Sequence, residues 1–423
     1  MDRLMKDSGV EWIGEIPEHW KICKLKNVAT IQTGNTPTKN EQDTFYSDEE
    51  GIPWIKAEDL GSNIAITKTK EYLTIEGAKQ GRIFAPNTVF VCCIASIGKT
   101  GFSQIECSCN QQINGVYFNK MFWKYGYYMT LAQEVEYLLN ASGNVMKILN
   151  TDKQSKLICP FPPQKEQQKI ADFLDEKVGE IDKVIETTKA TIEDYKNYKQ
   201  SLITEAVTKG IYNDICKQTG NIHIPEIPEN WEMKKMKYIF YIKKDIAGEE
   251  GYDILSITQK GIKVKDITSN EGQLAADYSK YQLVNAGDFA MNHMDLLTGW
   301  VDVSAFNGVT SPDYRVFNFI NEEGYNRRYY LYLMQMCYMD KIFYGLGQGV
   351  SNLGRWRLQA DKFLNFRVPV PSESEQEEIA NYLDEKCIEI DNLISAKEQL
   401  VEDMESYKKS LIYEYVTGKK EVE

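Results

Sequence analysis

The sequence predicts an α+β protein in which two globular α/β-type units are separated by two long helices packed as an antiparallel coiled coil. Three observations predict this fold. Residues 160–208 and 369–417 are two copies of one sequence, and the motif EIPEHW at 15–20 recurs as EIPENW at 226–231. Both copies of the long segment carry an apolar seam at helical spacing. We therefore expect an internal pseudo-twofold repeat divided into residues 1–158, 159–212, 213–367 and 368–423.

Each repeated segment is predicted to form one long helix. Its apolar positions alternate in steps of four and three residues, which is the a/d pattern of a coiled coil. The seam residues are Leu174, Ile181, Ile185, Ile192 and Leu202 in the first segment, and Leu383, Ile390, Ile394, Val401 and Leu411 in the second. Neither seam can remain in water, and a whole globular unit joins them, so we expect the helices to pack on each other antiparallel. The alternative is that each helix lies on its own domain.

Local signals mark where these helices begin and end. Prolines stop the preceding strand and direct the chain into each helix at Pro162, Pro163, Pro369 and Pro371. Ser372 followed by Glu375 is a capping-box pattern, and Gly210 and Gly418 are stop signals. A helix over residues 164–208 would be about 65 Å long at about 1.5 Å per residue.

The two globular units show short β-type runs between turn clusters, and each contains one helix. In the first unit we expect strands at 88–93, 115–118 and 156–161 and a helix near 123–140. The second unit repeats this layout with strands at 288–292, 314–319 and 366–370 and a helix near 325–343. Trp20 and Trp231 open the units beside a proline, so we expect them to be packing anchors.

The composition is that of a globular protein, with 42% hydrophobic and 12% aromatic residues. The longest apolar run, around residues 89–97, is far shorter than the roughly 20 residues that a membrane-spanning helix needs. The first residues lack the apolar core of a signal peptide. Nine cysteines at irregular spacing suit free thiols. We therefore expect a cytoplasmic protein.

The net charge of −13 argues against a simple DNA-binding protein, in which a basic surface is expected. The acidic excess lies mainly on the last helix and at the N-terminal edge. Basic residues cluster late in the second unit at Arg355, Arg357, Lys362 and Arg367. We interpret this distribution as a sign that a partner supplies part of any affinity for nucleic acid.

Catalytic motifs are missing from the sequence. It contains no Asn-Pro-Pro or Asp-Pro-Pro loop of an adenine methyltransferase and no G-x-x-x-x-G-K-[ST] loop of an ATPase. The closely spaced cysteines do not have the spacing of a zinc site, so we expect no metal. His19 and His223 are expected to be structural, whereas His293 follows a predicted strand and is a candidate to face DNA.

Several motifs match a known family when they are taken together and in order. They are IQTGNTP, GIPWIKAEDL, SIGKTG and CNQQINGVYF in the first unit, AGDFAMNHM and GVTSPDYRVF in the second, and EQ-x-x-I-x-x-x-LDEK at each long helix. With these motifs, the chain resembles the specificity (S) subunit of type I restriction–modification systems along nearly its whole length.

The resemblance implies a DNA-recognition subunit that does not itself catalyse a reaction. Each globular unit would be a target-recognition domain that reads one half of an asymmetric bipartite sequence, and the paired helices would set the length of the unread spacer. Its partners would be double-stranded DNA, two copies of a methylation subunit and, where restriction occurs, restriction subunits. The cofactors would lie in those subunits: S-adenosylmethionine for methylation, and ATP with Mg²⁺ for restriction.

Three alternatives remain open at this point. The first is a methyltransferase fused to its own recognition domains, which the missing catalytic loop disfavours. The second is a structural coiled-coil adaptor, which predicts that targeting does not depend on residues 20–158. The third is the recognition subunit of a related system with fused methylation and cleavage.

Reading bases in a groove requires side-chain donors and acceptors: arginine and lysine suit guanine, and asparagine and glutamine suit adenine. The candidates for DNA contact in predicted loops are Thr33, Asn35, Thr36, Lys56, Lys99, Lys147, Lys243, Lys244, Gln259, Lys260, Asn292, His293, Gln348, Asn352, Arg355 and Arg357. Contacts with phosphates are commoner than contacts with bases. Asn110, Gln111, Ser311 and Tyr314 belong to the family motifs, so we expect them to shape the fold.

Overall fold

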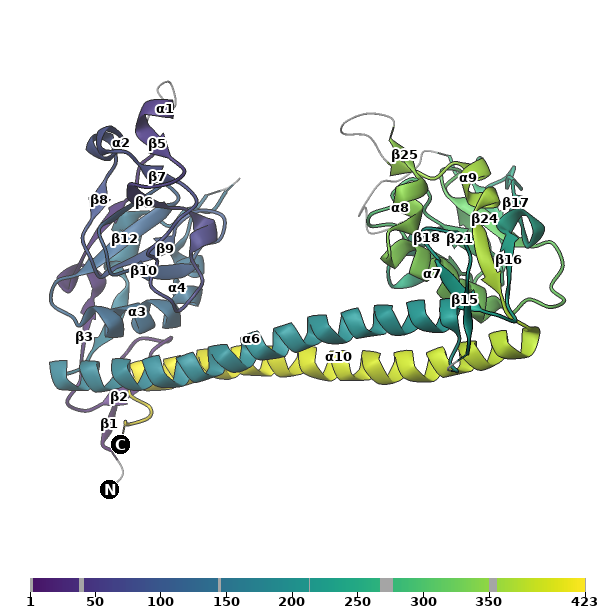
Figure 1. Cartoon of the computed structure of the whole chain (residues 1–423). Helices are drawn as coiled ribbons and strands as arrows, with labels where there is room; N and C mark the ends of the chain where they lie inside the picture. Colours follow the sequence, from purple (N-terminus) through teal and green to yellow (C-terminus); the bar gives the residue numbers. More distant parts are fainter. Residues whose placement is uncertain are drawn as a thin grey trace. The chain divides into compact units, whose positions relative to one another are not determined.

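The computed structural model of the chain divides into two compact units (Figure 1). Unit 1 consists of Met1–Lys189 and Glu398–Glu423, and unit 2 consists of Ala190–Lys397. The structure describes residues 3–37, 42–143, 146–212, 214–266, 277–349 and 356–422. Each unit contains one globular domain and one stretch of each long helix.

The main sheet of unit 1 is antiparallel, with strand order β10–β9–β12–β4. Its strands are β10 Thr100–Ser103, β9 Thr88–Cys92, β12 Ile113–Phe118 and β4 Ala29–Thr33. Helix α3 (Trp123–Ala132) packs on β9 and β10. Every residue of β9 is buried, which explains why its sequence is a continuous apolar run rather than an alternating one.

A second sheet of unit 1 has the strand order β5–β7–β6–β11–β8. Its strands are β5 Tyr46–Ser47, β7 Tyr72–Leu73, β6 Ile52–Ile55, β11 Cys107–Cys109 and β8 Ile83–Phe84. The Phe84 ring lies so close to Gly115 of β12 that a Cβ on this glycine would be 2.3 Å from it. The absence of a side chain at Gly115 therefore lets the two sheets share a core.

Smaller elements complete unit 1. They are β1 Met5–Asp7 paired with β2 Glu15–Pro17, β3 Lys21–Lys24 paired with β13 Ile158–Phe161, the helices α1 Gln42–Phe45, α2 Ile75–Gln80, α4 Glu134–Asn140 and α5 Thr151–Lys156, and the 3-10 turns Leu25–Asn27 and Ala57–Asp59. The expected helix near 123–140 is interrupted at Gln133, where ψ is 8°. The strand expected from Lys156 begins at Ile158, because α5 ends at Lys156.

The C-terminal residues close onto the N-terminal residues of unit 1. Lys419 Nζ donates hydrogen bonds to the carbonyl oxygens of Ile13 (2.6 Å) and Glu15 (3.2 Å). Gly418 has a φ of +75° and lies so close to Trp20 that a Cβ would be 2.9 Å from its ring. The chain can therefore turn here only because the residue is glycine.

The main sheet of unit 2 has the strand order β17–β24–β21–β22 and repeats that of unit 1. Its strands are β17 Phe240–Lys243, β24 Arg315–Phe319, β21 Phe289–Met291 and β22 Val301–Val303. Its core is aromatic: Phe289 stacks on Phe317 with ring centroids 5.1 Å apart, and Phe240 stacks on Phe319 at 5.0 Å. Such pairs stabilise a core beyond the area that they bury.

The remaining elements of unit 2 are short. They are the pairs β14 Cys216–Gln218 with β15 Glu226–Pro228, β16 Glu232–Lys235 with β27 Arg367–Val370, β18 Leu255–Thr258 with β19 Gly261–Val264, β20 Gln282–Val284 with β23 Gly308–Thr310 and β25 Gln348–Gly349 with β26 Trp356–Arg357, the helices α7 Arg327–Met339, α8 Ile342–Leu346 and α9 Ala360–Asn365, and the 3-10 turn Met236–Tyr238. The helix expected near 325–343 ends earlier, at Met339, because Lys341 has a left-handed φ of 55°.

The two repeated segments form the long helices α6 (Gln164–Lys209) and α10 (Glu373–Val416). The capping box before α10 is confirmed: the Ser372 N–H donates to a Glu375 carboxylate oxygen at 3.0 Å, and the Glu375 N–H donates to Ser372 Oγ at 3.3 Å. Gly210 follows α6 with a φ of +79° and confirms the predicted stop. Among the described residues, no helix is both long and apolar enough to cross a membrane.

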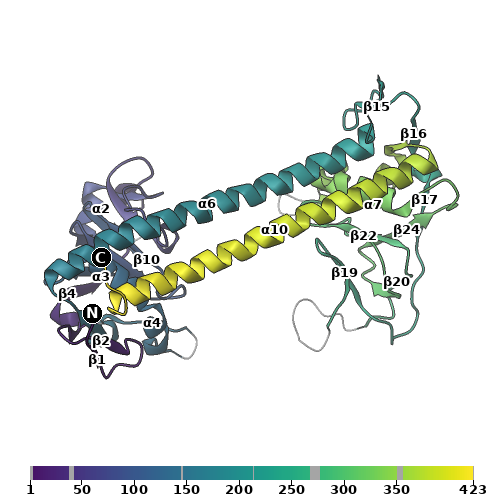
Figure 2. The ribbon, with the colours of Figure 1, turned by 90° about the horizontal axis from the view of Figure 1, so that it is seen from below.

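Within unit 1, α6 and α10 run antiparallel (Figure 2). The Phe173 and Tyr415 ring centroids are 4.4 Å apart. Further along α6, Asp182 pairs with Lys408 at 2.7 Å, and Lys189 pairs with Glu405 at 3.0 Å. Partner numbers fall on α10 as they rise on α6, which defines the antiparallel direction.

Unit 2 shows the same antiparallel pairing between the other ends of the helices. Lys397 Nζ lies 5.9 Å from the centre of the Tyr195 ring, and Lys199 lies 2.7 Å from Asp391. The predicted seam residues are buried at Leu174, Ile181, Ile185, Ile192, Leu383, Ile390, Val401 and Leu411, and half-buried at Leu202 and Ile394. The alternative of two separate helices is therefore wrong.

Candidate nucleic-acid interface

Each globular domain is fastened to the first turn of a long helix by a tryptophan. The Trp20 indole N–H donates to Glu166 on α6 at 2.9 Å, and the Trp231 indole N–H donates to Glu375 on α10 at 3.3 Å. The two tryptophans are 0% and 1% exposed, which confirms their prediction as packing anchors.

A buried glutamine follows each of these glutamates. The Gln167 side-chain oxygen accepts the backbone N–H of Phe122 at 2.7 Å, just before α3. The Gln376 side-chain oxygen accepts the backbone N–H of Asn326, also at 2.7 Å, just before α7. These bonds satisfy N–H groups that a helix leaves free at its start, so each glutamine fixes where a domain helix begins.

A buried tyrosine on each domain helix reaches the end of the other long helix. The Tyr125 hydroxyl donates to the carbonyl of Val416 at 2.8 Å, and the Tyr329 hydroxyl donates to the carbonyl of Val207 at 3.0 Å. Both carbonyls belong to last turns, where helices leave acceptors unpaired. Each domain is therefore held by the start of one long helix and the end of the other.

The predicted residues at the end of β4 are held within the domain. Thr33 Oγ1 donates to the Asn114 side chain at 2.7 Å, and Thr36 Oγ1 donates to Gln111. The Asn35 side chain donates to the carbonyl of Gln80 at 2.6 Å. These side chains shape the loop, so their contact with DNA remains a prediction that would require other atoms or a rearrangement.

The predicted lysines of unit 1 differ in their environment. Lys56 pairs with Glu71 at 2.7 Å and lies over the Trp54 ring at 4.9 Å. Lys99 donates to the carbonyl of Ala57 at 2.7 Å. Lys147 is exposed. Of the three, Lys147 presents its ammonium to solvent most openly.

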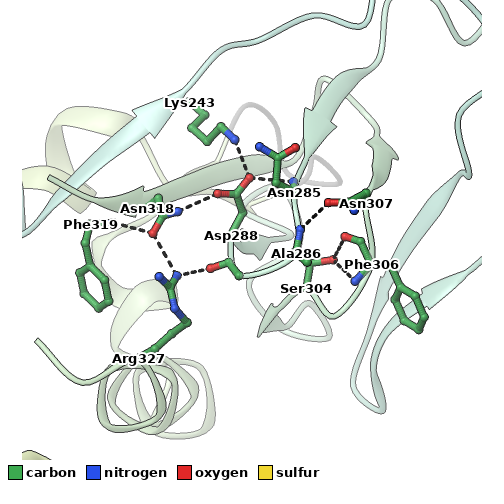
Figure 3. A network of polar contacts seen from close by, with 11 residues as sticks. Lys243, Asn285, Ala286, Asp288, Ser304, Phe306, Asn307, Asn318, Phe319 and Arg327 are labelled. Atoms are coloured by element: carbon green, nitrogen blue, oxygen red, sulfur yellow. Dashed lines mark hydrogen bonds and ion pairs between the residues drawn. The ribbon is translucent and has the colours of Figure 1, made fainter. Parts of the chain in front are cut away.

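Lys243 is buried in a polar network beside the main sheet of unit 2 (Figure 3). Its ammonium lies 2.6 Å from the Asp288 carboxylate, and the two side chains are only 8% and 2% exposed. Asp288 also accepts the backbone N–H of Asn285 and the side-chain amide of Asn318, both at 2.8 Å. The Lys243 ammonium is therefore engaged inside the domain, and its contact with DNA stays a prediction that would require a rearrangement.

His293 is also buried, with 5% of its surface exposed. Burial, with the positive charges of Arg315 and Arg357, lowers the pKa of His293 to about 3, so the ring is neutral near pH 7. Its backbone carbonyl accepts the N–H of Leu358 at 3.0 Å. The side chain therefore faces the interior of the domain, and its contact with DNA stays a prediction that would require a rearrangement.

The other predicted residues of unit 2 lie near its surface. Lys244, Gln259, Lys260, Gln348 and Arg357 are exposed, and Asn292 is half-buried. Lys260 lies in the turn between β18 and β19. The predicted contacts Asn352 and Arg355 lie outside the described residues.

Asn292 lies on the wall of a hollow of about 490 Å³ in unit 2. Tyr278, Tyr281 and Tyr314 also line it, and the first two rings are 5.0 Å apart. Aromatic faces beside polar groups are surfaces on which nucleic-acid bases stack. Tyr278 and Tyr281 were not among the predicted residues, although the segment YSKY (278–281) signals them, and Tyr314 was expected only to shape the fold.

Two arginines near predicted residues were also missed. Arg82 is exposed, donates to the carbonyl of Thr33, and gives its backbone N–H to the Asn35 side chain at 2.6 Å. Arg315 is buried, and its guanidinium donates to the carbonyl of Leu358 at 2.9 Å. Arg315 lies in the quoted motif GVTSPDYRVF, so the signal for it was the motif itself.

All nine cysteines are free thiols. Cys23 and Cys159 face each other across paired strands, with sulfur atoms 3.7 Å apart. Within the described ranges, no group of three or more His, Cys, Asp or Glu side chains is placed to hold a metal ion.

Comparison with known proteins gives consistent matches. The family model "Type I restriction modification DNA specificity domain" matches residues 17–194 and 228–402. The type I restriction enzyme MjaVIII specificity subunit of Methanocaldococcus jannaschii is 25% identical over 96% of this chain and 93% of its own length. The putative type I restriction enzyme MjaX specificity subunit of the same organism is 25% identical over 96% of this chain and 95% of its own.

A solved structure shares the fold. It is a chain described under "Structural basis underlying complex assembly and conformational transition of the type I R-M system", with a TM-score of 0.69 and 13% identity. The match covers 96% of this chain and 99% of that one.

Proposed function

The chain belongs to the family of type I restriction–modification DNA specificity domains and carries two of them, and from this premise we propose that each unit reads one half of an asymmetric bipartite DNA sequence. Specificity subunits of this family are generally non-catalytic. The chain would therefore choose the DNA sequence, and other subunits would carry out the chemistry.

One observation carries the proposal: the two domains share their attachments to the long helices but not their loops. The tryptophan, glutamine and tyrosine contacts recur in both units, each with a partner at the equivalent position of the repeat. In contrast, the chain after β4 carries Asn35, whereas the chain after β17 carries the exposed Lys244. Two domains that are attached in the same way but expose different loop residues suit a DNA target with two unlike halves.

The partners and cofactors are part of the proposal. We expect double-stranded DNA, two copies of a methylation subunit that binds S-adenosylmethionine, and restriction subunits with ATP and Mg²⁺ where restriction occurs. The net charge of −13 supports a role for a basic partner in DNA binding. The paired helices would set the length of the spacer that is not read.

Exchange of one domain tests the modular reading. Residues 20–158 would be replaced by those of a relative, and the methylated motif mapped in cells that contain the methylation partner. One half of the motif should change and the other should stay. A change in both halves, or in neither, contradicts the proposal. An unchanged motif would favour the structural adaptor.

A second experiment separates recognition from catalysis. The purified chain alone would be incubated with labelled S-adenosylmethionine and DNA, with the complex containing its methylation partner as the positive control. We expect label in DNA only with the complex. Transfer of label by the chain alone would show a fused methyltransferase.

A further inference from the structure

Each unit carries a short hairpin that is tethered to the main sheet through a buried leucine. In unit 1 the hairpin lies between α4 and α5, and Ser142 pairs with Ile148. The next residue, Leu149, is fully buried and donates its N–H to the carbonyl of Cys93 at 2.9 Å. Its own carbonyl accepts the side-chain amide of Asn114 at 3.1 Å.

Unit 2 has the same device between α8 and α9, where β25 pairs with β26 (Figure 1). Leu358 follows β26, is fully buried, and donates its N–H to the carbonyl of His293 at 3.0 Å. Its carbonyl accepts the Arg315 guanidinium at 2.9 Å. The two tethers use the same backbone atoms, but the hairpins carry different side chains.

The stem of the unit 2 hairpin is fixed by Trp356. Its ring stacks on Tyr344 with centroids 5.2 Å apart, and its indole N–H donates to the Tyr344 carbonyl at 2.7 Å. A Cβ on Gly347 or Gly349 would lie 2.6 Å or 2.5 Å from this ring. The Trp356 ring can pack here only because Gly347 and Gly349 have no side chains. The packed ring fixes the orientation of the β25–β26 pair, including the face opposite Trp356.

That other face carries Gln348 and Arg357. The two residues are direct partners in the antiparallel pair β25–β26, so their side chains project to the same side. Both are exposed. Arginine can bind guanine with two hydrogen bonds in the major groove, glutamine can bind adenine in the same way, and a two-stranded ribbon fits this groove.

A buried positive charge lies behind this stem. Arg315 is 5% exposed, and its guanidinium lies 4.9 Å from the centre of the Phe363 ring. Among the residues that the structure describes, no carboxylate forms an ion pair with it. Burial lowers the pKa of Arg315 to about 10, so it stays charged near pH 7. With Arg357 it makes this face attractive to a polyanion despite the acidic chain.

We propose that Gln348 and Arg357 are the base-reading pair of the second recognition domain, and that Ser142 and Ile148 occupy the equivalent place in the first. The inference rests on the proposed function and adds to it the residues that touch base edges. The equivalent pair has different chemistry: a hydroxyl and an apolar side chain, which suits contact with a thymine methyl group. Two unlike pairs at one position of the fold would read two unlike half-sites.

The test compares Arg357→Lys with Arg357→Ala in the complex with the methylation partner. Lysine keeps the charge of arginine but lacks its planar pair of donors. The probes are a duplex with the motif mapped for the wild-type complex, duplexes with single base-pair changes in the second half, and an unrelated duplex. Arg357→Lys should weaken binding to the motif duplex about 10- to 100-fold and abolish discrimination at one base pair. Its affinity for the unrelated duplex should stay within about twofold of wild type.

The contrary results are distinct. If Arg357→Lys discriminates like wild type while Arg357→Ala weakens binding to all duplexes equally, Arg357 contacts a phosphate and the inference fails. If Gln348→Ala, a second variant on the exposed face, leaves discrimination at every base pair intact, the pair is also refuted. A wild-type complex that does not discriminate between duplexes would instead overturn the proposed function. Unfolding midpoints equal to wild type establish that each variant is folded.

Discussion

The Tyr125 hydroxyl donates a 2.8 Å hydrogen bond to the backbone carbonyl of Val416, which lies 291 residues further along the chain. Tyr329 makes the equivalent bond to Val207 at 3.0 Å. Both tyrosines are fully buried. The two bonds show that both domains dock in the same way, each through a domain helix on the last turn of a long helix.

Removal of either hydroxyl should destabilise its unit. Tyr125→Phe or Tyr329→Phe leaves a buried carbonyl without its donor, which costs about 1–3 kcal/mol of unfolding free energy. Urea unfolding of the purified chain measures this loss. Tyr117→Phe, at a side chain that is 44% exposed, is the matched control and should change little. Equal effects at Tyr117 and Tyr125 would contradict the role of the bond.

Loss of the buried cation in Figure 3 should be more costly. Lys243→Met leaves the Asp288 carboxylate buried without its partner, so we expect a loss of about 3–5 kcal/mol. Lys244→Met, at the exposed neighbour, should stay within about 0.5 kcal/mol of wild type. Denaturant titrations of both variants check this difference. Stability of Lys243→Met near that of wild type would show that Asp288 finds another partner.

Acid should loosen the contacts between the domains and the long helices. Partial burial alone raises the pKa of Glu166 and Glu375, but hydrogen bonds from Trp20 to Glu166 and from Ser372 to Glu375 lower each pKa below its ordinary value. The folded chain therefore binds these protons less readily than the unfolded chain does. The stability that they add is present above the ordinary pKa of 4.5 and is lost as the pH falls through the folded-state value.

The double variant Glu166→Gln and Glu375→Gln tests this linkage. Its unfolding free energy should fall less steeply than that of wild type between about pH 5 and pH 3, because the two titrating groups are gone. Glu377→Gln, at an exposed position of the same helix, is the control and should follow the wild-type curve. Parallel curves for the double variant and wild type would show that the two glutamates do not set the acid sensitivity.

The seam of α10 can be tested with two isoleucines that lie two residues apart. Ile390 is 4% exposed and Ile388 is 62% exposed. Ile390→Ala should cost about 2–5 kcal/mol because it opens a cavity in the helix pairing. Ile388→Ala should cost less than about 0.5 kcal/mol. Thermal and urea unfolding compare the two, and a reversed order would mean that the helices pair through another face.

Lengthening both long helices should lengthen the spacer. One heptad inserted after Lys189 and one after Lys397, with the seam spacing kept, adds about 10 Å of helix, or about three base pairs of duplex at about 3.4 Å each. Methylation mapping should find the same two half-sites further apart. A heptad in α6 alone mismatches the seams and should abolish assembly or activity. An unchanged motif with either variant would refute the ruler.

The long helices and their attachment points could be predicted because their signals are local. A regular apolar spacing over many turns identifies α6 and α10, and a proline, a capping box and a glycine mark their ends. Trp20 and Trp231 stood out through their repeated motif. The breaks at Gln133 and Lys341 could not be predicted, since each depends on how the following helix packs in the domain.

The candidate site was less predictable, because the availability of a polar side chain depends on its neighbours in space. Lys243 and Lys244 are adjacent in sequence, yet Lys243 is buried against Asp288 from another strand region and Lys244 is exposed. His293 follows a strand as predicted, but its side chain is buried, and its backbone carbonyl accepts the N–H of Leu358. Asp288 and Leu358 are both distant in sequence from the residues that they contact, so neither contact can be predicted from composition or spacing.

The division of unit 1 between Met1–Lys189 and Glu398–Glu423 has a consequence for how the protein is made. A ribosome adds the intervening residues in about 10–40 s at about 5–20 residues per second. Unit 2 is contiguous and can mature as it emerges, whereas the earlier-made domain waits for the final helical turns. During that interval the apolar seam of α6 has no partner helix and is exposed on the nascent chain. Chaperones, or the same helix of a second nascent chain, can bind the exposed seam in this period.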